Sequence, residues 1–227
     1  MAVAGDNMKC LICGGTTEKF ELEKENVFIC NDCGYGRPSI QEPIIYDESY
    51  EKKYLSYEEN KINKIRFKFV AAVSNYYGTS INDILDFGCG SGSFVRMIRE
   101  IGLTAYGFDV NDFTVDLRPP ENYKPKIIVA WDSFEHLTDE QQKEFFDLAK
   151  NAKVICLSVP DFQTPNKNYI SDWRHYRPGE HLHYYTIKSI SEKFKQNGFQ
   201  LVNFSHDEDI VRTAPWNNNI LSVGFIK

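Results

Sequence analysis

The chain has 227 residues, enough for one sizeable hydrophobic core and a small additional module. No apolar run approaches the ~18 residues that a membrane-spanning helix needs, and the N-terminal residues lack the charged and apolar regions of a secretory signal, so we expect a cytoplasmic protein without a membrane partner. The formal net charge of −6 disfavours a nucleic-acid partner but leaves it open.

The N-terminal residues 8–40 are predicted to form a zinc ribbon. Two C-x2-C pairs, with sixteen residues between them, contain four of the six cysteines: Cys10, Cys13, Cys30 and Cys33. Two such pairs complete the tetrahedral sulfur shell that structural zinc prefers, and residues 16–29 between them are expected to form a hairpin. Because four protein ligands leave no open position, we expect a structural zinc. Disulfides or a redox pair are the alternatives, and the lack of an export signal disfavours disulfides.

A connector containing Pro and Tyr is expected at residues 41–57, followed by a helix at 58–77 that Gly78 ends. In this helix apolar residues recur at helical spacing on one side. Lysines occupy another side: Lys61, Lys64 and Lys68. We interpret the lysine side as a solvated helix face rather than as a nucleic-acid patch, because glutamates balance it.

From residue 81 onward, strands and helices alternate. Strands are predicted at 81–87, 103–109, 126–132 and 153–160, helices at 93–102, 138–152 and 186–198, and two closing strands at 199–205 and 219–227. This alternation predicts an α/β fold for residues 58–227, a Rossmann-like doubly wound and mostly parallel sheet with an antiparallel edge. The remaining cysteines, Cys89 and Cys156, are expected to be core thiols.

The stretch ILDFGCGSGSF predicts a strand that runs into a glycine turn and then into a helix. Gly88, Gly90 and Gly92 let the turn reverse tightly and bring backbone N–H groups close to a ligand. A dinucleotide site would have a third glycine where Ser93 stands. Asp86 precedes the turn, and its carboxylate would repel a pyrophosphate but attract the ammonium of an amino acid. The turn therefore favours a cofactor that carries an amine.

A second acid stands at the end of the next predicted strand. Asp109 is placed to accept hydrogen bonds from both ribose hydroxyls of a nucleoside. An amine near Asp86 and a ribose near Asp109 together describe S-adenosylmethionine. A glycine turn that serves only packing is the alternative.

These motifs carry a family resemblance. Residues 81–137 resemble a class I S-adenosylmethionine-dependent methyltransferase: LDFGCGSG is similar to its first motif, GFDV to its acidic ribose motif and WDSFEHL to its fourth-strand segment. The resemblance implies cofactor or pocket contacts from Asp86, Gly88, Cys89, Gly90, Gly92, Asp109, Val110, Asp132 and Ser133. The zinc-binding N-terminus, the connector and EHLHYYT resemble bacterial and phage glycan- or metabolite-modifying methyltransferases and, more distantly, the sugar C-methyltransferases.

Two features depart from these families. Only seventeen residues separate Asp109 from the strand at 127, so the helix and strand that usually hold the adenine must be reduced. Where the sugar C-methyltransferases have Tyr-His-Glu-His, this chain has Pro178, Gly179, Glu180 and His181. The second departure argues against a transferred C-methylation mechanism.

A long loop separates the strand ending near Val159 from the helix beginning near Thr186. It is rich in aromatic residues and leaves the carboxyl end of a central strand, so it should cover the methyl group and hold the acceptor. A neutral histidine suits removal of a hydroxyl proton. Three histidines are candidates for the general base, in this order: His181, His183 and His136. Packing roles for the same histidines are the alternative.

Two further interpretations of the loop stay open. A metal site could be built from four of its residues: His175, Glu180, His181 and His183. An H-x-H pair on an extended chain, however, places its two rings apart. Arg174 and Arg177 could clamp a phosphate or carboxylate of the acceptor, or could pair with surface acids.

The sequence thus predicts an S-adenosylmethionine-dependent methyltransferase with a structural zinc, acting on a hydroxyl of a sugar, nucleotide-sugar or other small metabolite. The alternative is a catalytically silent cofactor-fold module whose zinc ribbon binds a partner or nucleic acid. A nucleotide-sugar oxidoreductase is a third interpretation, disfavoured by Ser93 and Asp86. The oligomeric state is left open.

Overall fold

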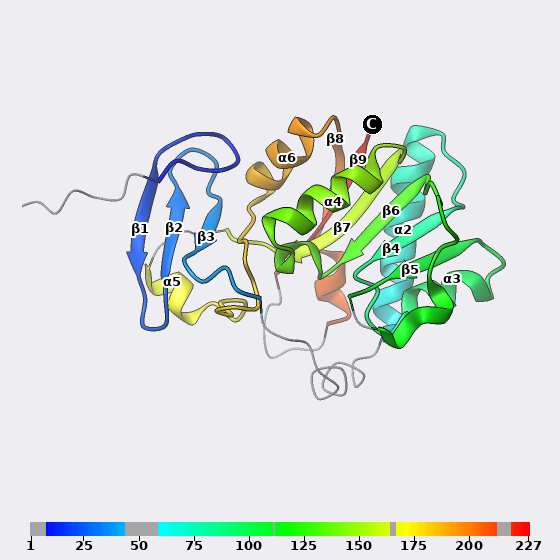
Figure 1. Cartoon of the computed structure of the whole chain (residues 1–227), viewed down its shortest axis with the longest axis horizontal. Helices are drawn as coiled ribbons and strands as arrows, with labels where there is room; N and C mark the ends of the chain where they lie inside the picture. Colours follow the sequence, from blue (N-terminus) through cyan, green and yellow to red (C-terminus); the bar gives the residue numbers. More distant parts are fainter. Residues whose placement is uncertain (1–7, 44–58, 111, 164–166, 213–218) are drawn as a thin grey trace, which may run out of the picture.

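The computed structural model describes residues 8–43, 59–110, 112–163, 167–212 and 219–227. A six-stranded sheet carries helices on both faces, and a small three-stranded sheet lies beside it at the N-terminal end of the chain (Figure 1). Of the predicted connector, residues 44–57 lie outside the described part. None of the described helices is long and apolar enough to cross a membrane.

The small sheet has the order β1-β2-β3 and is antiparallel throughout. Strands β1 (Thr17–Glu21) and β2 (Asn26–Cys30) form the predicted hairpin. Strand β3 (Gly36–Pro38) was not predicted, because three residues are too few to show an alternating pattern. The two C-x2-C turns lie at one end of this sheet, immediately before β1 and immediately after β2.

The large sheet has the order β5-β4-β6-β7-β9-β8. Its strands are β4 (Ile84–Phe87), β5 (Ala105–Phe108), β6 (Ile127–Trp131), β7 (Val154–Pro160), β8 (Gln200–Ser205) and β9 (Ile220–Ile226). The first four are parallel, and β9 runs against β7 and β8, which confirms the predicted antiparallel pairing at this edge. The strand order reverses between β4 and β6, and a ligand in such sheets binds at the carboxyl ends of the strands at this switch point.

Four helices cover the two faces as the alternation predicts: α2 (Glu59–Tyr77), α3 (Ser93–Glu100), α4 (Asp139–Ala149) and α6 (Ile187–Gln196). A fifth helix, α5 (Lys167–Asp172), lies in the loop after β7, was not predicted, and packs through Ile170 against β2 of the small sheet (Figure 1). Three 3-10 turns complete the described elements: η1 (Asp112–Leu117), η2 (Phe134–His136) and η3 (Asp207–Ile210). Helix α4 begins with a capping box between Thr138 and Gln141. Between β5 and β6 the described residues contain η1 and no strand, in agreement with the shortened segment predicted there.

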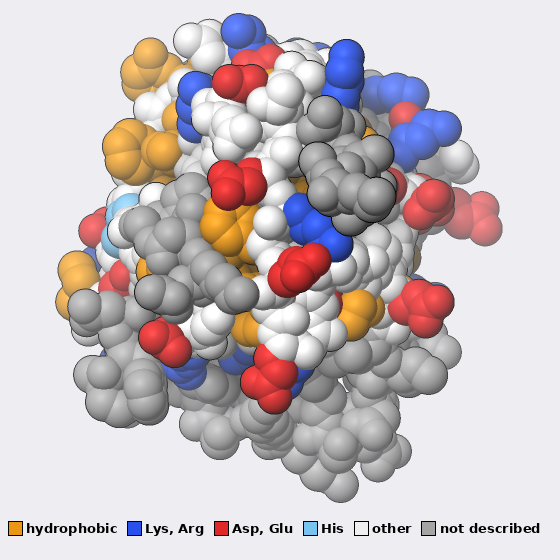
Figure 2. Space-filling model, turned by 90° about the vertical axis from the view of Figure 1, so that its left-hand side faces the viewer, with side chains coloured by type: hydrophobic (Ala, Val, Ile, Leu, Met, Phe, Trp, Pro, Cys, Tyr) orange, Lys and Arg blue, Asp and Glu red, His pale blue; other side chains and the backbone are white. Residues whose placement is uncertain are grey.

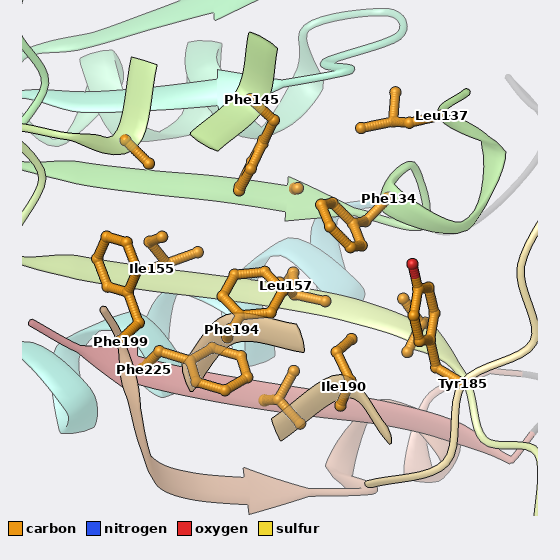
Figure 3. Packing of buried hydrophobic residues seen from close by; sticks show 14 of the residues in the cluster. Phe134, Leu137, Phe145, Ile155, Leu157, Tyr185, Ile190, Phe194, Phe199 and Phe225 are labelled. Carbon is orange, nitrogen blue, oxygen red and sulfur yellow. The ribbon is translucent and has the colours of Figure 1, made fainter. Parts of the chain in front are cut away.

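Alternate residues of the strands feed two separate cores. Ile127 and Val129 pack with α2 and α3, whereas Ile128 and Ala130 pack with α4 and α6 on the opposite face. Figure 3 shows the second core, in which the Phe194 ring of α6 stacks on Phe225 of β9 at a centroid distance of 4.2 Å. The lysines of α2 are exposed, as expected.

The small sheet is fused to this second core. Tyr35 and Ile12 belong to the same buried cluster as Phe145 and Phe194. The backbones of Gly36 and Tyr184 exchange two hydrogen bonds of 2.9 Å. We call the contact between residues 33–41 and residues 182–188 the module interface. Because it joins a zinc-ribbon-like sheet to the main core through buried apolar contacts, the two parts share one folded unit.

Candidate functional site

The glycine turn follows β4 at the switch point of the sheet. Gly88, Gly90 and Gly92 have φ values of 76°, 52° and 77°, a region that favours glycine. A Cβ added at Gly88 would lie 2.6 Å from the Cβ of Ser133, so this approach requires glycine. The hydroxyl of Ser133 donates to the carbonyl of Phe87 at 2.9 Å, which fixes the end of β6 against the end of β4.

Asp86 lies beneath this turn and is 2% exposed. Among the described residues, its Oδ1 finds no hydrogen-bond partner. Burial raises the pKa of Asp86 to about 7, with Arg66 opposing the rise and Asp109 adding to it. A buried carboxyl group with an unpartnered oxygen is costly, and a cationic ligand group would satisfy it.

Asp109 follows β5 and reaches the same turn. Its Oδ2 accepts the backbone N–H of Gly90 at 2.8 Å. The side chain of Val110 beside it is 64% exposed. Cys89 is half-buried and packs against Gly107, where an added Cβ would lie 2.7 Å from the Cys89 sulfur. The structure therefore brings Asp86, the glycine turn and Asp109 together at the carboxyl ends of β4 and β5.

Asp132 directly follows β6, and its side chain is 34% exposed in an otherwise largely buried charge network. Its Oδ2 accepts hydrogen bonds from Nη2 of Arg66 and Nη2 of Arg212, both at 2.5 Å, and its Oδ1 accepts from Ser158. Both arginines also contact Glu208, whose side chain is fully buried. Despite burial, which opposes ionisation, the two guanidinium groups hold the pKa of Asp132 below its usual range. Asp132 has a φ of 50°, an uncommon value that these contacts stabilise.

His181 and His136 come together next to this network. Their rings meet edge to face at a centroid distance of 4.6 Å. The Nδ1–H of His136 donates to the Glu180 carbonyl at 2.7 Å, because a carbonyl can only accept. Nδ1 of His181, which is 3% exposed, has no hydrogen-bond partner in the described part of the chain. Burial lowers the pKa of both rings, and that of His181 falls well below its usual value.

His183 lies at the module interface instead. Its Nδ1 is 2.5 Å from the Tyr35 hydroxyl and its Nε2 is 2.8 Å from the Leu137 carbonyl, so both ring nitrogens are hydrogen-bonded. Burial lowers the pKa of His183 to about 3, with Arg37 contributing in the same direction. The rings of Tyr184 and Tyr185 are also buried here, which explains why this short stretch collects aromatic and imidazole groups.

The two loop arginines differ in their surroundings. Nη1 of Arg177 donates to Oε1 of Glu180 at 2.6 Å, an ion pair across one turn of the loop. Arg174 is exposed. The sequence did not predict the two arginines that hold Asp132. Arg66 lies on a helix of which only the apolar and lysine sides were interpreted, and Arg212 follows η3, 80 positions after Asp132. Only their common partner, the acid at the end of β6, was visible in the sequence.

The four N-terminal cysteines converge as the spacing predicts. One sulfur atom from each lies within 4.8 Å of the others: Cys10, Cys13, Cys30 and Cys33. The Cys10–Cys33 and Cys13–Cys30 sulfur distances are 3.6 and 3.4 Å. Sulfurs about 2.3 Å from one tetrahedral zinc would be about 3.8 Å apart, so the cluster fits this ion. Backbone N–H groups also point at two of the sulfurs, which favours thiolates.

Comparison with known proteins agrees with this geometry. The profile of the methyltransferase domain family matches residues 54–203. A curated relative, an uncharacterized methyltransferase of Geobacillus sp. (strain WCH70), is 26% identical over 185 residues, which cover 68% of this chain and 81% of the relative.

Two solved structures share the fold. The magnesium protoporphyrin IX methyltransferase ChlM of Synechocystis PCC 6803, solved with bound SAH, has a TM-score of 0.54 at 16% identity, covering 81% of this chain and 89% of that one. A SAM-dependent methyltransferase of Archaeoglobus fulgidus has a TM-score of 0.55 at 15% identity, covering 80% and 100%. At these identities the similarity supports the fold alone.

Proposed function

Because the chain belongs to the methyltransferase domain family and is an S-adenosylmethionine-dependent methyltransferase, we propose that its acceptor is a hydroxyl of a sugar, nucleotide-sugar or other small metabolite. The family match covers about two thirds of the chain, including the glycine turn and both acids. The acceptor itself is inferred from the loop after β7 and from the groups beside the cofactor site.

The observation that carries the cofactor assignment is the pair of carboxylates on either side of the glycine turn. Asp86 presents a buried, unpartnered oxygen among the described residues, which suits an ammonium group. Asp109 already binds a backbone N–H of the turn and can accept from two ribose hydroxyls. Ser133 supports the turn from below at Gly88, and Asp132 orders the end of β6 through its arginines.

The cofactor supplies an electrophilic methyl group on a sulfonium, so the chain has to align the acceptor and assist loss of its proton. His181 remains the first candidate for this assistance, because it has an unpartnered Nδ1 within the described part and lies beside His136. His183 ranks behind both, because its two ring nitrogens already have partners.

The acceptor is proposed to lie under the loop between β7 and α6. This loop leaves the carboxyl end of β7, next to the ends of β4 and β6 where the cofactor residues gather. Arg174 and Arg177 are the candidates to bind an acidic acceptor such as a nucleotide-sugar, and each would have to exchange an existing contact, which for Arg177 is the ion pair with Glu180.

The four-cysteine cluster is proposed to hold a structural zinc in a reducing, cytoplasmic environment. The rival function, a silent module whose ribbon binds nucleic acid, receives less support. On the face shown in Figure 2, acidic and basic side chains of the described residues are interspersed and form no continuous basic patch.

Calorimetry with S-adenosylhomocysteine and with NAD tests the cofactor assignment, and binding of NAD alone would overturn it. Turnover with isotopically labelled S-adenosylmethionine on a panel of sugars and nucleotide-sugars, followed by product mass spectrometry, tests the acceptor class. A label found only on nitrogen or carbon would contradict hydroxyl methylation.

A further inference from the structure

We propose that Glu135, His136 and His181 bind a divalent first-row transition-metal ion that contacts the acceptor hydroxyl. The inference rests on the proposed function for the identity of the acceptor, but the metal site stands on its own geometry. One ligand atom from each of these residues lies within 4.8 Å of the other two. Ligand atoms about 2.1 Å from one ion lie roughly 3–3.5 Å apart, so small side-chain rotations would close the set.

The backbone holds the three side chains in place. Glu135 and His136 belong to η2, three residues or fewer after Ser133, which supports the glycine turn. The Glu135 carbonyl accepts the backbone N–H groups of Leu182 and His183 at 2.9 and 3.2 Å. These bonds fix the loop that carries His181 against η2. The candidate site therefore lies beside the cofactor residues at the carboxyl end of β6.

Two buried polar atoms in this cluster are unpartnered within the described residues. They are Oε2 of Glu135, on a residue 2% exposed, and Nδ1 of His181, on a residue 3% exposed. Unpartnered polar groups at such depth are uncommon because each loses its hydration without compensation. A single cation between them would satisfy both at once.

His136 has the orientation of a metal ligand. Its Nδ1–H donates to the Glu180 carbonyl, which leaves the lone pair of Nε2 directed elsewhere. That Nε2 lies 3.8 Å from Oε1 of Glu135. A backbone carbonyl that binds one ring nitrogen and orients the other toward the ion is the usual outer-shell arrangement for metal-bound histidine.

The surrounding charges permit a cation. Arg66 and Arg212 are balanced by Asp132 and Glu208 in the network described above. Arg177, the other cation near the cluster, is paired with Glu180. Among the described residues, the carboxylate of Glu135 forms no ion pair with an arginine, so a divalent ion would supply its counter-charge.

Two imidazoles and one carboxylate suit Mn2+, Fe2+, Co2+ or Zn2+ and leave positions open for another ligand. With His181 as a ligand of the ion rather than as the base, an acceptor hydroxyl bound there would lose its proton to solvent more readily. Its oxygen would then form the bond to the methyl carbon, the carbon–sulfur bond would break, and the electron pair would stay on sulfur. This site differs from the four-cysteine cluster, whose sulfur shell is closed.

Titration of the full chain, with its N-terminal zinc retained, by MnCl2 under calorimetry and Mn2+ electron paramagnetic resonance tests the proposal. We expect one added Mn2+ per chain in the wild type and at least tenfold weaker binding in Glu135→Gln and His181→Ala. His206→Gln removes a histidine outside the cluster and should leave Mn2+ binding unchanged. Circular dichroism and S-adenosylhomocysteine affinity identify a variant that has failed to fold, and the near-isosteric Glu135→Gln guards against that outcome.

No Mn2+ site in the wild type, with Co2+ also failing to bind, would overturn the metal proposal, as would equal Mn2+ binding in all variants. Either result leaves the cofactor assignment intact, because S-adenosylhomocysteine binding is measured separately. A wild type that binds Mn2+ but no S-adenosylhomocysteine would instead sink the proposed function and keep the metal site.

Discussion

The hydroxyl of Tyr35 lies 2.5 Å from Nδ1 of His183, so the N-terminal module and the loop after β7 share a buried hydrogen bond. The two residues are 148 positions apart in the chain. Because His183 also bonds the Leu137 carbonyl, it connects the module, the loop and the segment after η2. These contacts favour a structural role for His183 over the role of general base.

Tyr35→Phe should therefore lower stability more than it affects cofactor binding. The substitution leaves Nδ1 of buried His183 without its partner, which costs roughly 1–3 kcal/mol of unfolding free energy. Urea denaturation measures this change, and S-adenosylhomocysteine affinity should shift less than twofold. Tyr76→Phe, at a tyrosine 73% exposed, is the matched control with no expected change. Lost turnover at unchanged stability would instead place His183 in the chemistry.

Removal of the zinc proposed for the four-cysteine cluster should destabilise the whole chain and not only the module. The cysteine cluster and Tyr35 share a buried core with α4 and α6, so the two parts should unfold together. We expect elemental analysis to find one zinc per chain at this cluster, and Cys13→Ser to lose it with a lower melting temperature. Cys89→Ser, at the half-buried cysteine of the glycine turn, should retain the zinc. Separate thermal transitions for module and core would contradict this prediction.

Cofactor affinity should fall as the pH is lowered, because Asp86 becomes protonated. Burial raises the pKa of Asp86 to about 7 in the cofactor-free chain, and only its ionised form pairs with an ammonium group. Affinity is therefore full above that pKa and is lost as pH falls, about tenfold between pH 8 and pH 6. Calorimetry with S-adenosylhomocysteine at both pH values measures the ratio. Asp86→Asn should bind weakly with little pH dependence, and a pH dependence equal to that of the wild type would exclude Asp86 as its source.

Asp109→Asn should weaken S-adenosylhomocysteine binding by roughly 10–100-fold. The substitution removes the charge that strengthens hydrogen bonds from ribose hydroxyls, each worth about 1.5–3 kcal/mol with a charged acceptor. Asp116→Asn neutralises an exposed acid on η1 and should leave the affinity unchanged. Wild-type affinity in Asp109→Asn would show that the ribose lies elsewhere.

Glu208→Gln should destabilise the fold by roughly 3–5 kcal/mol, because it leaves two largely buried guanidinium groups with one carboxylate. Glu208 is fully buried and contacts both Arg66 and Arg212. Denaturant unfolding measures the loss. Glu144→Gln, at an exposed glutamate on α4, should change stability by less than about 0.5 kcal/mol. A similarly small change at Glu208 would mean that the network is not buried in solution.

The sequence by itself determined most of the elements and their order, although the short strand β3 and the helix α5 were not predicted. Apolar spacing located the strands and helices to within a few residues, glycines marked the turn after β4, and the spacing of the cysteine pairs defined the module. These signals are local, because the apolar periodicity of a helix or a strand is visible within a few neighbouring residues. The two acids at the ends of neighbouring parallel strands could also be paired, since such ends meet at one edge of a sheet.

Only the tertiary structure decided which loop residues face which neighbour. His181 and His183 are two positions apart, yet His181 contacts His136 beside the candidate cofactor residues and His183 contacts Tyr35 of the module. The contacts of Asp132 with Arg66 and Arg212 likewise join distant segments. These contacts follow from how the module, the loop and the sheet pack together. Packing between distant segments produces no periodic pattern in the sequence from which it could be predicted.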